Sequence, residues 1–167
     1  MNVRIAALAA LLTVVVAPLG RAGGKAGEKG MVTFHLETDP TTNPKLVFPQ
    51  MDNGKQRLFL RAPEFTLKDM VAFSPFPSGT GDEYGLVFQL KDSGKRHLNV
   101  LSLSSQGKYL LAQANGRVVD GVIIDKPVED GVIVIWKGIS NEEVKIFDKV
   151  LPRIGDAGKG KKKKKTK

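Results

Sequence analysis

Two histidines, His35 and His97, are the side chains of this 167-residue chain best suited to acid–base catalysis near neutral pH, and cysteine is absent. The absence of cysteine excludes disulfides, thiol nucleophiles and cysteine-ligated metals. A Ser-His-Asp arrangement stays open with either histidine, but no GxSxG motif presents a serine nucleophile. The alternation of residues 31–37 turns His35 outward and His97 falls on a predicted helix, so we expect both to be exposed surface residues.

The spacing of other candidate ligands gives little support to phosphate or metal chemistry. Lys95 follows Gly94, but residues 88–96 lack the first glycine and the Ser/Thr of a P-loop, and the loop 77–83 has no lysine. Three acidic pairs fall at loop ends or at a helix start: Asp82-Glu83, Glu129-Asp130 and Glu142-Glu143. None of them has the spacing of oxygen ligands that a calcium-binding loop requires. We therefore expect no catalytic residue, metal or cofactor. An envelope hydrolase that uses Asp or Glu and one histidine remains the alternative.

Clustered lysines near the C-terminus are the most distinctive chemistry of the sequence. Such a segment cannot bury apolar surface, so residues 155–167 are predicted to be a disordered tail. The tail could bind an anionic membrane surface or another polyanion, with each lysine near an anionic membrane contributing about 1 kcal/mol. It could equally act as a solubilising tail. The seven lysines proposed to bind polyanions are Lys159, Lys161, Lys162, Lys163, Lys164, Lys165 and Lys167.

The net charge of +9 comes from the two ends of the chain. Residues 31–154 contain 15 basic and 15 acidic side chains, so this part is neutral. A nucleic-acid-binding domain usually carries a basic face on its folded part. The charge distribution therefore argues against a nucleic-acid partner.

The first 22 residues have the pattern of a secretory signal peptide. Arg4 supplies a positive n-region, residues 5–19 form an apolar run, and small residues at 20 and 22 favour cleavage after Ala22. The 15-residue run is shorter than the roughly 20 residues that a membrane-spanning helix needs, which favours cleavage over a retained anchor. We therefore expect an exported protein, in the periplasm or outside the cell. Residues 23–30 are expected to be a flexible leader.

Aromatic residues offer candidate contacts with a partner. Phe73 and Phe76 lie beside two prolines in residues 72–77 (AFSPFP). This stretch could expose its rings to a protein partner, or it could be a loop packed over the core, which we favour. Trp136 ends the continuous apolar stretch 132–136, which is typical of a central strand, so Trp136 is predicted to lie in the core.

The elements that must position these residues follow from alternation, turns and caps. Asn53-Gly54 and Asn115-Gly116 predict two-residue hairpin turns, because both residue types tolerate positive φ. Pro75 and Pro77 are expected to end a short edge strand at 71–73. Asp120-Gly121 suggests a bulge. The other predicted strands are 31–37, 46–50, 56–61, 84–90, 109–114, 117–124 and 132–136.

Two helices complete the prediction. Ser93 is the expected cap of a helix that ends near Leu103, with Leu98, Leu101 and Val100 on its inner side. Ser140 and Glu143 form a capping box at the start of the last helix, which Pro152 ends. The predicted fold is α+β: an N-terminal β-hairpin segment, then a mostly antiparallel sheet with two helices packed on one face, all in a single domain of residues 31–154.

From about residue 61 to 151 the chain resembles the head of the first periplasmic domain of SecD and SecDF, subunits of the protein-export motor. The resemblance lies in residues 63–70 (PEFTLKDM), 84–90 with the helix after them, 108–120 (KYLLAQANGRVVD) and 128–151, where a strand leads to a Ser-Glu-Glu-like helix start. The chain departs from the family at Gly121, where proline is usual. It also has no predicted transmembrane segment after residue 19.

This resemblance implies a stand-alone, exported, head-like module that uses no proton gradient and has no catalytic residues. The partner that it implies is a polypeptide or another component of the cell envelope. We therefore expect a non-enzymatic binding module, with the hydrolase kept as the alternative.

Overall fold

The computed structural model describes residues 31–40, 42–79 and 81–156. The predicted signal peptide (1–22), the leader (23–30) and the seven tail lysines lie outside these residues. The described part is α+β, with mostly antiparallel strands and two α-helices, which confirms the predicted fold class. Its elements in chain order are β1 (Val32–Thr38), β2 (Val47–Asp52), β3 (Lys55–Leu60), β4 (Phe65–Thr66), β5 (Met70–Pro77), β6 (Tyr84–Leu90), α1 (Asp92–Ser104), β7 (Tyr109–Ala114), β8 (Arg117–Ile123), β9 (Val132–Ile139) and α2 (Asn141–Val150), with single 3-10 turns at Pro44–Leu46 and Leu67–Asp69.

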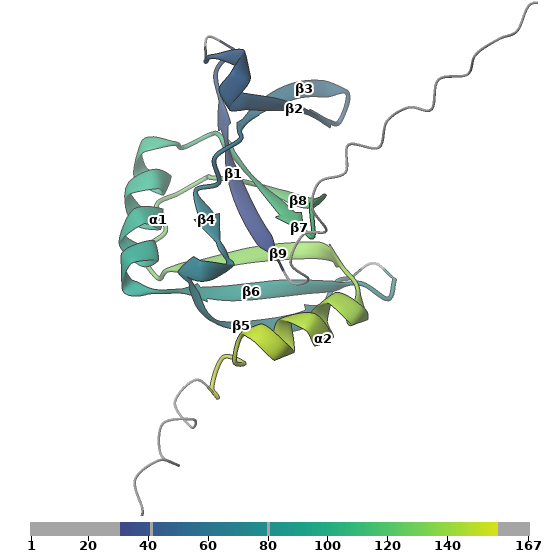
Figure 1. The fold of residues 1–167 in the computed structure, drawn as a ribbon. Coiled ribbons are helices and arrows are strands. Elements are labelled where there is room, and N and C mark those ends of the chain that lie inside the picture. The colour runs from purple at the N-terminus through teal and green to yellow at the C-terminus, as the bar shows by residue number, and fades with distance from the viewer. Residues whose placement is uncertain (1–30, 41, 80, 157–167) are drawn as a thin grey trace, which may run out of the picture.

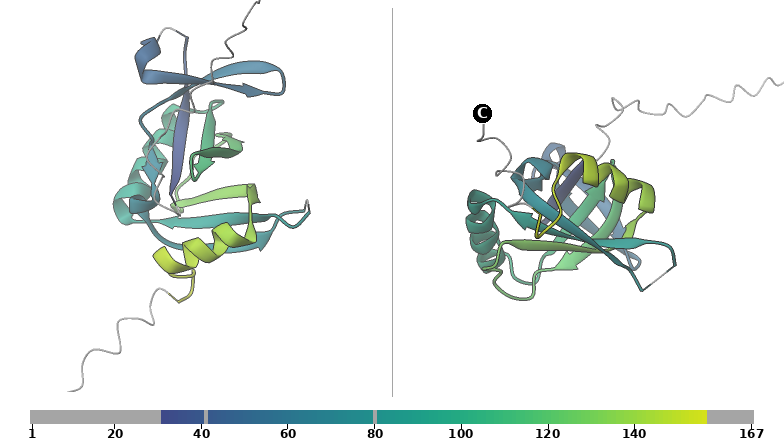
Figure 2. Two further views of the ribbon diagram at one scale, coloured as in Figure 1. Left: turned by 45° about the vertical axis from the view of Figure 1, so that its right-hand side comes forward. Right: turned by 90° about the horizontal axis from the view of Figure 1, so that it is seen from below.

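The strands divide between two sheets (Figure 1). The larger sheet has the order β2-β3-β1-β7-β8, with β4 also paired to β1, and the smaller has the order β5-β6-β9. In Figures 1 and 2 the smaller sheet crosses below the larger one at a steep angle, with α1 beside both sheets and α2 along the smaller one. The sequence patterns predict the strands and their antiparallel pairing, but they contain no signal for this division.

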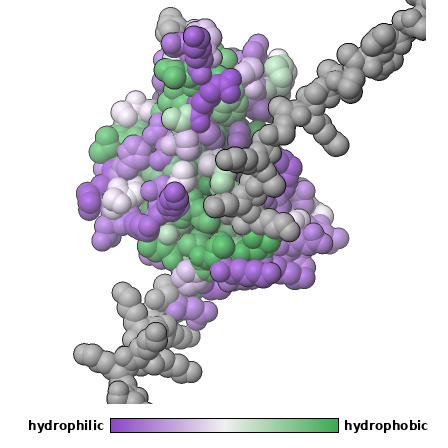
Figure 3. Space-filling model, viewed as in Figure 1, coloured by the Kyte–Doolittle hydropathy of each residue, from purple (hydrophilic) through white to green (hydrophobic). Residues whose placement is uncertain are grey.

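A cluster of aromatic side chains joins the two sheets to α2. Phe34 of β1 contacts Phe88 of β6 edge to face, with ring centroids 6.3 Å apart. Phe147 of α2 lies 5.7 Å from Phe88 and 5.8 Å from Phe73 of β5, measured between ring centroids. All four rings are fully buried. In Figure 3 a row of hydrophilic residues runs along the lower edge of the molecule, where α2 lies, below a hydrophobic area, as expected of an amphipathic helix that packs one face against a core.

The predicted hairpin turns and the capping box of the last helix are confirmed. Asn53 and Asn115 have φ of 47° and 52° and are followed by glycines with φ of 78°, as two-residue hairpin turns require. In the capping box of α2, the Ser140 hydroxyl accepts a bond from the Glu143 N–H, and the Glu143 carboxylate accepts one from the Ser140 N–H. These features are predictable because each depends on residues that are close in the sequence.

The start and inner face of α1 differ in part from the prediction. The helix begins at Asp92 with Lys91 at the N-cap, so Ser93 is not the cap. Leu98 and Leu101 are buried as expected, but Val100 is exposed. Val100 is two residues after Leu98 and one before Leu101, and neither spacing places it on the face that these leucines share.

The strand expected at 71–73 is longer, because β5 extends through both prolines to Pro77. The Phe73 N–H donates to the Pro152 carbonyl (3.0 Å), and the Phe73 carbonyl accepts from the Ile154 N–H (2.8 Å), so the backbone of Phe73 faces away from β6. Pro75 and Pro77 follow at a spacing of two and therefore also face away from β6. Their missing N–H groups remove no bond between β5 and β6, which is why the strand tolerates them.

His35 is buried, and the prediction that it is exposed is wrong. Its Nδ1–H donates to the Leu60 carbonyl (2.8 Å), its Nε2 lies 2.9 Å from the Thr33 hydroxyl, and its ring contacts Phe48 of β2 edge to face. The β2–β3 hairpin covers the face of β1 that alternation assigns to solvent. Burial lowers the pKa of His35, although the hydrogen bond to Leu60 acts in the opposite direction.

Candidate binding groove between β8 and β9

Strand β8 lies at one edge of the larger sheet and β9 at one edge of the smaller sheet, and the two strands lie side by side. They run in opposite directions, since Asp120 of β8 meets Trp136 of β9 and Arg117 meets Gly138. The Asp120 carboxylate accepts a bond from the Trp136 N–H at 2.7 Å. Side chains rather than a ladder of backbone bonds therefore join these two strands, which belong to different sheets.

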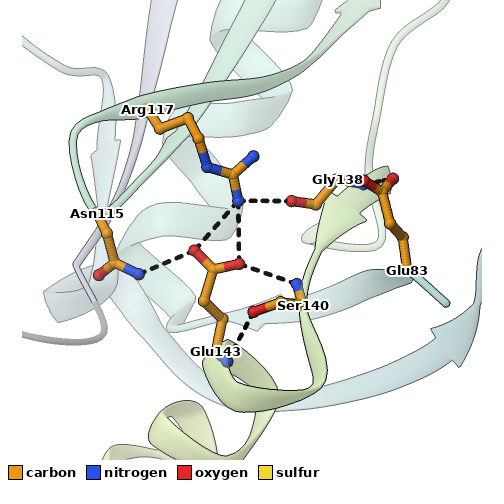
Figure 4. Close-up of polar contacts among 6 residues, drawn as sticks. All are labelled: Glu83, Asn115, Arg117, Gly138, Ser140 and Glu143. Carbon is orange, nitrogen blue, oxygen red and sulfur yellow. Dashed lines mark hydrogen bonds and ion pairs between the residues drawn. The ribbon is translucent and has the colours of Figure 1, made fainter.

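One end of the gap between β8 and β9 is closed by hydrogen bonds centred on Glu143 of α2 (Figure 4). The carboxylate accepts bonds from Arg117 Nη2 (3.0 and 3.2 Å), Asn115 Nδ2 (3.0 Å) and the Ser140 N–H (2.9 Å). Asn115 lies in the β7–β8 turn and Arg117 starts β8. We refer to Glu143, Arg117, Asn115 and Ser140 as the Glu143 network; it joins β8 to the start of α2.

Gly138 brings β9 into the same network. Its carbonyl accepts a bond from Arg117 Nη2 (2.8 Å), and its N–H donates to the Glu83 carboxylate (3.0 Å), as Figure 4 shows. Gly138 has φ of 86°, and a Cβ at this position would lie 2.9 Å from the Val119 carbonyl oxygen. Glycine is therefore required for β8 and β9 to approach this closely.

The surroundings of Glu143 favour its charged form. Burial acts to raise the pKa of this carboxyl, but the Ser140 N–H, Asn115 and Arg117 together outweigh it, so the pKa is held below its usual value. The Glu143 network is therefore held together by an ionised carboxylate at neutral pH.

The other end of the gap opens over an apolar pocket of about 250 Å³. Trp136 and Ile123 flank it from opposite strands and are 58% and 47% exposed. The hydroxyl of Ser102 in the lining donates to the Asn99 carbonyl and accepts from the Val128 N–H, so it serves the local fold. The complete lining is Phe34, Leu98, Ser102, Leu110, Val122, Ile123, Ile124, Asp125, Lys126, Val128, Val132, Ile133, Val134 and Trp136.

Trp136 is exposed, and the prediction that it lies in the core of a central strand is wrong. The central strand of the smaller sheet is β6, while β9 is at its edge. The apolar run in β9 conceals an alternation in which Ile133, Ile135 and Ile139 are buried and Trp136 faces outward. A continuous apolar run cannot by itself distinguish a strand buried on both faces from one with a binding surface on one face.

The two phenylalanines proposed as partner contacts have different positions. Phe73 is fully buried, which removes it from the accessible surface. Phe76 is partly exposed and its ring meets that of Trp136 at 5.9 Å, nearly perpendicular. The Phe76 ring lies over Gly85 of β6, where a Cβ would be 2.2 Å from it. Gly85 thus allows the aromatic surface to continue from Trp136 across β6 to Phe76, a role for which the sequence carries no local signal.

The histidines lie outside this surface. His97 Nε2 is 2.9 Å from a Glu64 carboxylate oxygen and its side chain is half exposed, as predicted, whereas His35 is buried. The two are not brought together with a common partner: His35 bonds to Thr33 and Leu60. Between residues 31 and 156, leaving aside 41 and 80, no three metal-ligating side chains of the His, Asp and Glu types converge.

No helix in the described ranges is long and apolar enough to cross a membrane.

A second pocket, of about 390 Å³, lies between the β2–β3 hairpin and the β7–β8 hairpin. Arg57 stacks on Tyr109 with its guanidinium carbon 4.0 Å from the ring centroid, and it bonds to Glu37 (2.8 Å) and Asp52 (3.1 Å). Glu37 also accepts a bond from the Tyr109 N–H. The Arg57 guanidinium is thus paired with two carboxylates, and these contacts hold the β2–β3 hairpin in place.

Comparison with known proteins supports the fold. No family model matches the chain, and no curated protein matches it. A solved structure of SecDF, described as a membrane component that enhances protein export, matches with a TM-score of 0.51 and 17% identity over 72% of this chain and 61% of that one. A structure of SecDF in a super-membrane-facing form matches with a TM-score of 0.49 and 17% identity over 71% of this chain and 18% of that one.

The first of these likenesses confirms the SecD-like fold that the sequence resemblance implies. At 17% identity, it shows the fold alone. The chain spans less than two thirds of the SecDF chain that it matches.

The Glu143 network predicts a specific dependence of stability on pH. The lowered pKa of Glu143 means that its contribution is present above the ordinary value of 4.5 and is lost as pH falls through the pKa in the folded state. We expect Glu143→Gln to lower the free energy of unfolding at pH 7 by about 1–2 kcal/mol, because charge-assisted hydrogen bonds are lost. The variant should also lose less stability than the wild type on acidification, as measured by urea unfolding.

Glu142→Gln is the matched control, because Glu142 is the exposed neighbouring carboxylate in the same helix turn. Its unfolding free energy at pH 7 should stay within about 0.5 kcal/mol of the wild type. Equal losses in the two variants would contradict the role assigned to Glu143.

Proposed function

We propose that this protein is a non-enzymatic, exported binding module that contacts extended polypeptide segments through the apolar surface between β8 and β9. The observation that carries this proposal is the pocket of about 250 Å³ flanked by the exposed Trp136 and Ile123. Export is supported by the signal-peptide pattern of residues 1–22, which lies outside the described residues. The SecD-like fold is consistent with a role as an accessory module in protein export.

The chemistry of the surface suits a partner recognised by apolar side chains rather than by charge. Trp136 and Ile123 line the pocket, Phe76 packs against Trp136, and core residues such as Phe34 and Leu98 complete the lining. Exposed aromatic residues beside a pocket are typical anchors of binding interfaces. A surface of this kind accepts many sequences that contain large apolar residues, which is the property an export accessory needs.

The fixed position of the surface also favours binding. The Glu143 network holds the closed end of the gap, and β9 is paired with β6 from Val132 to Ile135 and again at Ile139. A surface built on paired strands loses little conformational entropy when a partner binds. Most of the conformational entropy lost on binding is then that of the bound polypeptide.

Trp136→Ala tests this proposal. We expect the variant to bind reduced, carboxymethylated α-lactalbumin, a permanently unfolded probe, about tenfold more weakly than the wild type, since large aromatic anchors often contribute more than about 1 kcal/mol. Fluorescence anisotropy of the labelled probe measures the affinity.

Val100→Ala removes an apolar side chain with a similar exposed fraction, 63%, from the outer side of α1. Its affinity should equal that of the wild type. An equal loss in both variants, or no binding of the probe by the wild type, would rule out the surface proposed for polypeptide contact.

We propose a second role for the lysine-rich tail, which lies outside the described residues. Its seven lysines, together with the neutral charge of residues 31–154, support electrostatic attachment of the module to an anionic membrane surface or envelope polymer. Attachment of this kind raises the local concentration of the module near its partners, and it leaves the apolar surface between β8 and β9 available for binding.

Deletion of residues 157–167 tests the role of the tail. We expect the wild type to co-sediment with phosphatidylglycerol vesicles at low salt and to be released as salt is raised, because screening weakens such contacts. The deleted protein should stay in solution, and neither protein should bind phosphatidylcholine vesicles. Binding of the deleted protein to anionic vesicles at wild-type strength would contradict the proposed role.

A further inference from the structure

The backbone of β9 faces the gap with its unpaired groups. The Leu90 N–H donates to the Gly131 carbonyl (2.9 Å), and antiparallel pairing alternates from there, so Ile133 and Ile135 turn their backbone groups toward β6. Val134 and Trp136 turn theirs away from β6, toward β8. The bond from the Trp136 N–H to Asp120 agrees with this direction.

The backbone of β8 faces the same gap from the other side. The Ile124 N–H donates to the Lys108 carbonyl (2.8 Å), so Val122 also turns its backbone toward β7, and Ile123 and Gly121 turn theirs toward β9. The Gly121 N–H bonds to the Asp120 carboxylate, as the Trp136 N–H does. Ile123 and Val134 therefore present backbone groups to the gap at the two sides of the apolar pocket.

The other two outer strands carry proline on their free edges. Pro75 and Pro77 face outward on β5, where residues after Pro152 already cover the backbone of Phe73. On β2, the Arg61 N–H donates to the Leu46 carbonyl, which by alternation turns Pro49 outward. Proline on an edge strand prevents the pairing of a further strand. In the described part of the chain, β8 and β9 are the outer strands without such protection.

From these positions we infer that an extended polypeptide segment binds by adding a strand to the free edge of β9 at Val134, with an apolar side chain in the pocket beside Trp136. This inference rests on the proposed function and specifies how the polypeptide is held. Backbone hydrogen bonds to Val134 do not depend on the sequence of the partner, and the pocket adds a preference for apolar side chains. The partner is thus an unfolded segment with alternating apolar residues, rather than a folded protein.

Val134→Pro tests this mode, because it imitates the device that the chain itself uses at Pro75 and Pro77. The missing N–H would face the gap, so the pairing of β9 with β6 keeps its bonds. Val134→Ala is the matched control, which shortens the side chain and keeps the N–H. Met51→Pro removes an outward N–H from β2 instead and controls for the effect of proline on an edge.

The probe is a fluorescein-labelled nine-residue peptide of alternating Val and Ser, flanked by lysines for solubility. We expect Val134→Pro to weaken peptide binding at least tenfold, while Val134→Ala and Met51→Pro stay within threefold of the wild type. Circular dichroism checks that each variant folds. If Val134→Pro does not fold, a peptide N-methylated at its Val residues and one N-methylated at its Ser residues replace it; one of them should lose binding to the wild type.

Three outcomes would overturn the inference. Strand addition would be excluded if Val134→Pro bound the peptide as tightly as the wild type does, or if the wild type bound both methylated peptides as tightly as the unmodified one. If Trp136→Ala lost binding in the same experiment, the proposed function would remain intact. Self-association of the wild type that Val134→Pro abolishes would assign the edge to a second copy of the chain. Failure of the wild type to bind either the peptide or unfolded α-lactalbumin would remove the proposed function as well.

Discussion

The position of β8 against β9 depends on the hydrogen bonds that the Glu143 carboxylate accepts. This carboxylate draws together the β7–β8 turn, the first residue of β8 and the start of α2, and Arg117 extends the contact to Gly138 in β9. Because β8 and β9 are not joined by a ladder, these side-chain bonds determine where the two strands meet. A fixed junction at one end and an apolar pocket at the other give the gap its shape.

The edges of the two sheets explain why one surface is open and the others are closed. An unpaired strand edge is an aggregation hazard for any β-protein, and here proline and the segment after α2 protect β2 and β5. The free edges of β8 and β9 carry no such protection, next to Trp136 and Ile123. An edge left unprotected beside exposed apolar side chains is a feature that a binding module can use, and that a purely structural protein would avoid.

The sequence was informative where structure depends on neighbours in the chain. The Asn-Gly turns, the Ser140–Glu143 capping box and the order of strands and helices were predictable, and the family resemblance led to the observed fold. The groove between β8 and β9 is not predictable in this way. The sequence predicts Trp136 in the core because an apolar run hides its own alternation. It predicts His35 at the surface because nothing local reveals that the β2–β3 hairpin covers β1.

Amide hydrogen exchange, resolved by residue with NMR and measured with and without the alternating Val-Ser peptide, tests the central claim most directly. The account predicts that the peptide slows exchange most strongly at Val134, with smaller effects at Ile123 and Trp136, and leaves the amides of β2 and β5 unchanged. Slowing confined to the β2–β3 hairpin or to the outer side of α1, with Val134 exchanging at its free rate, would contradict binding between β8 and β9.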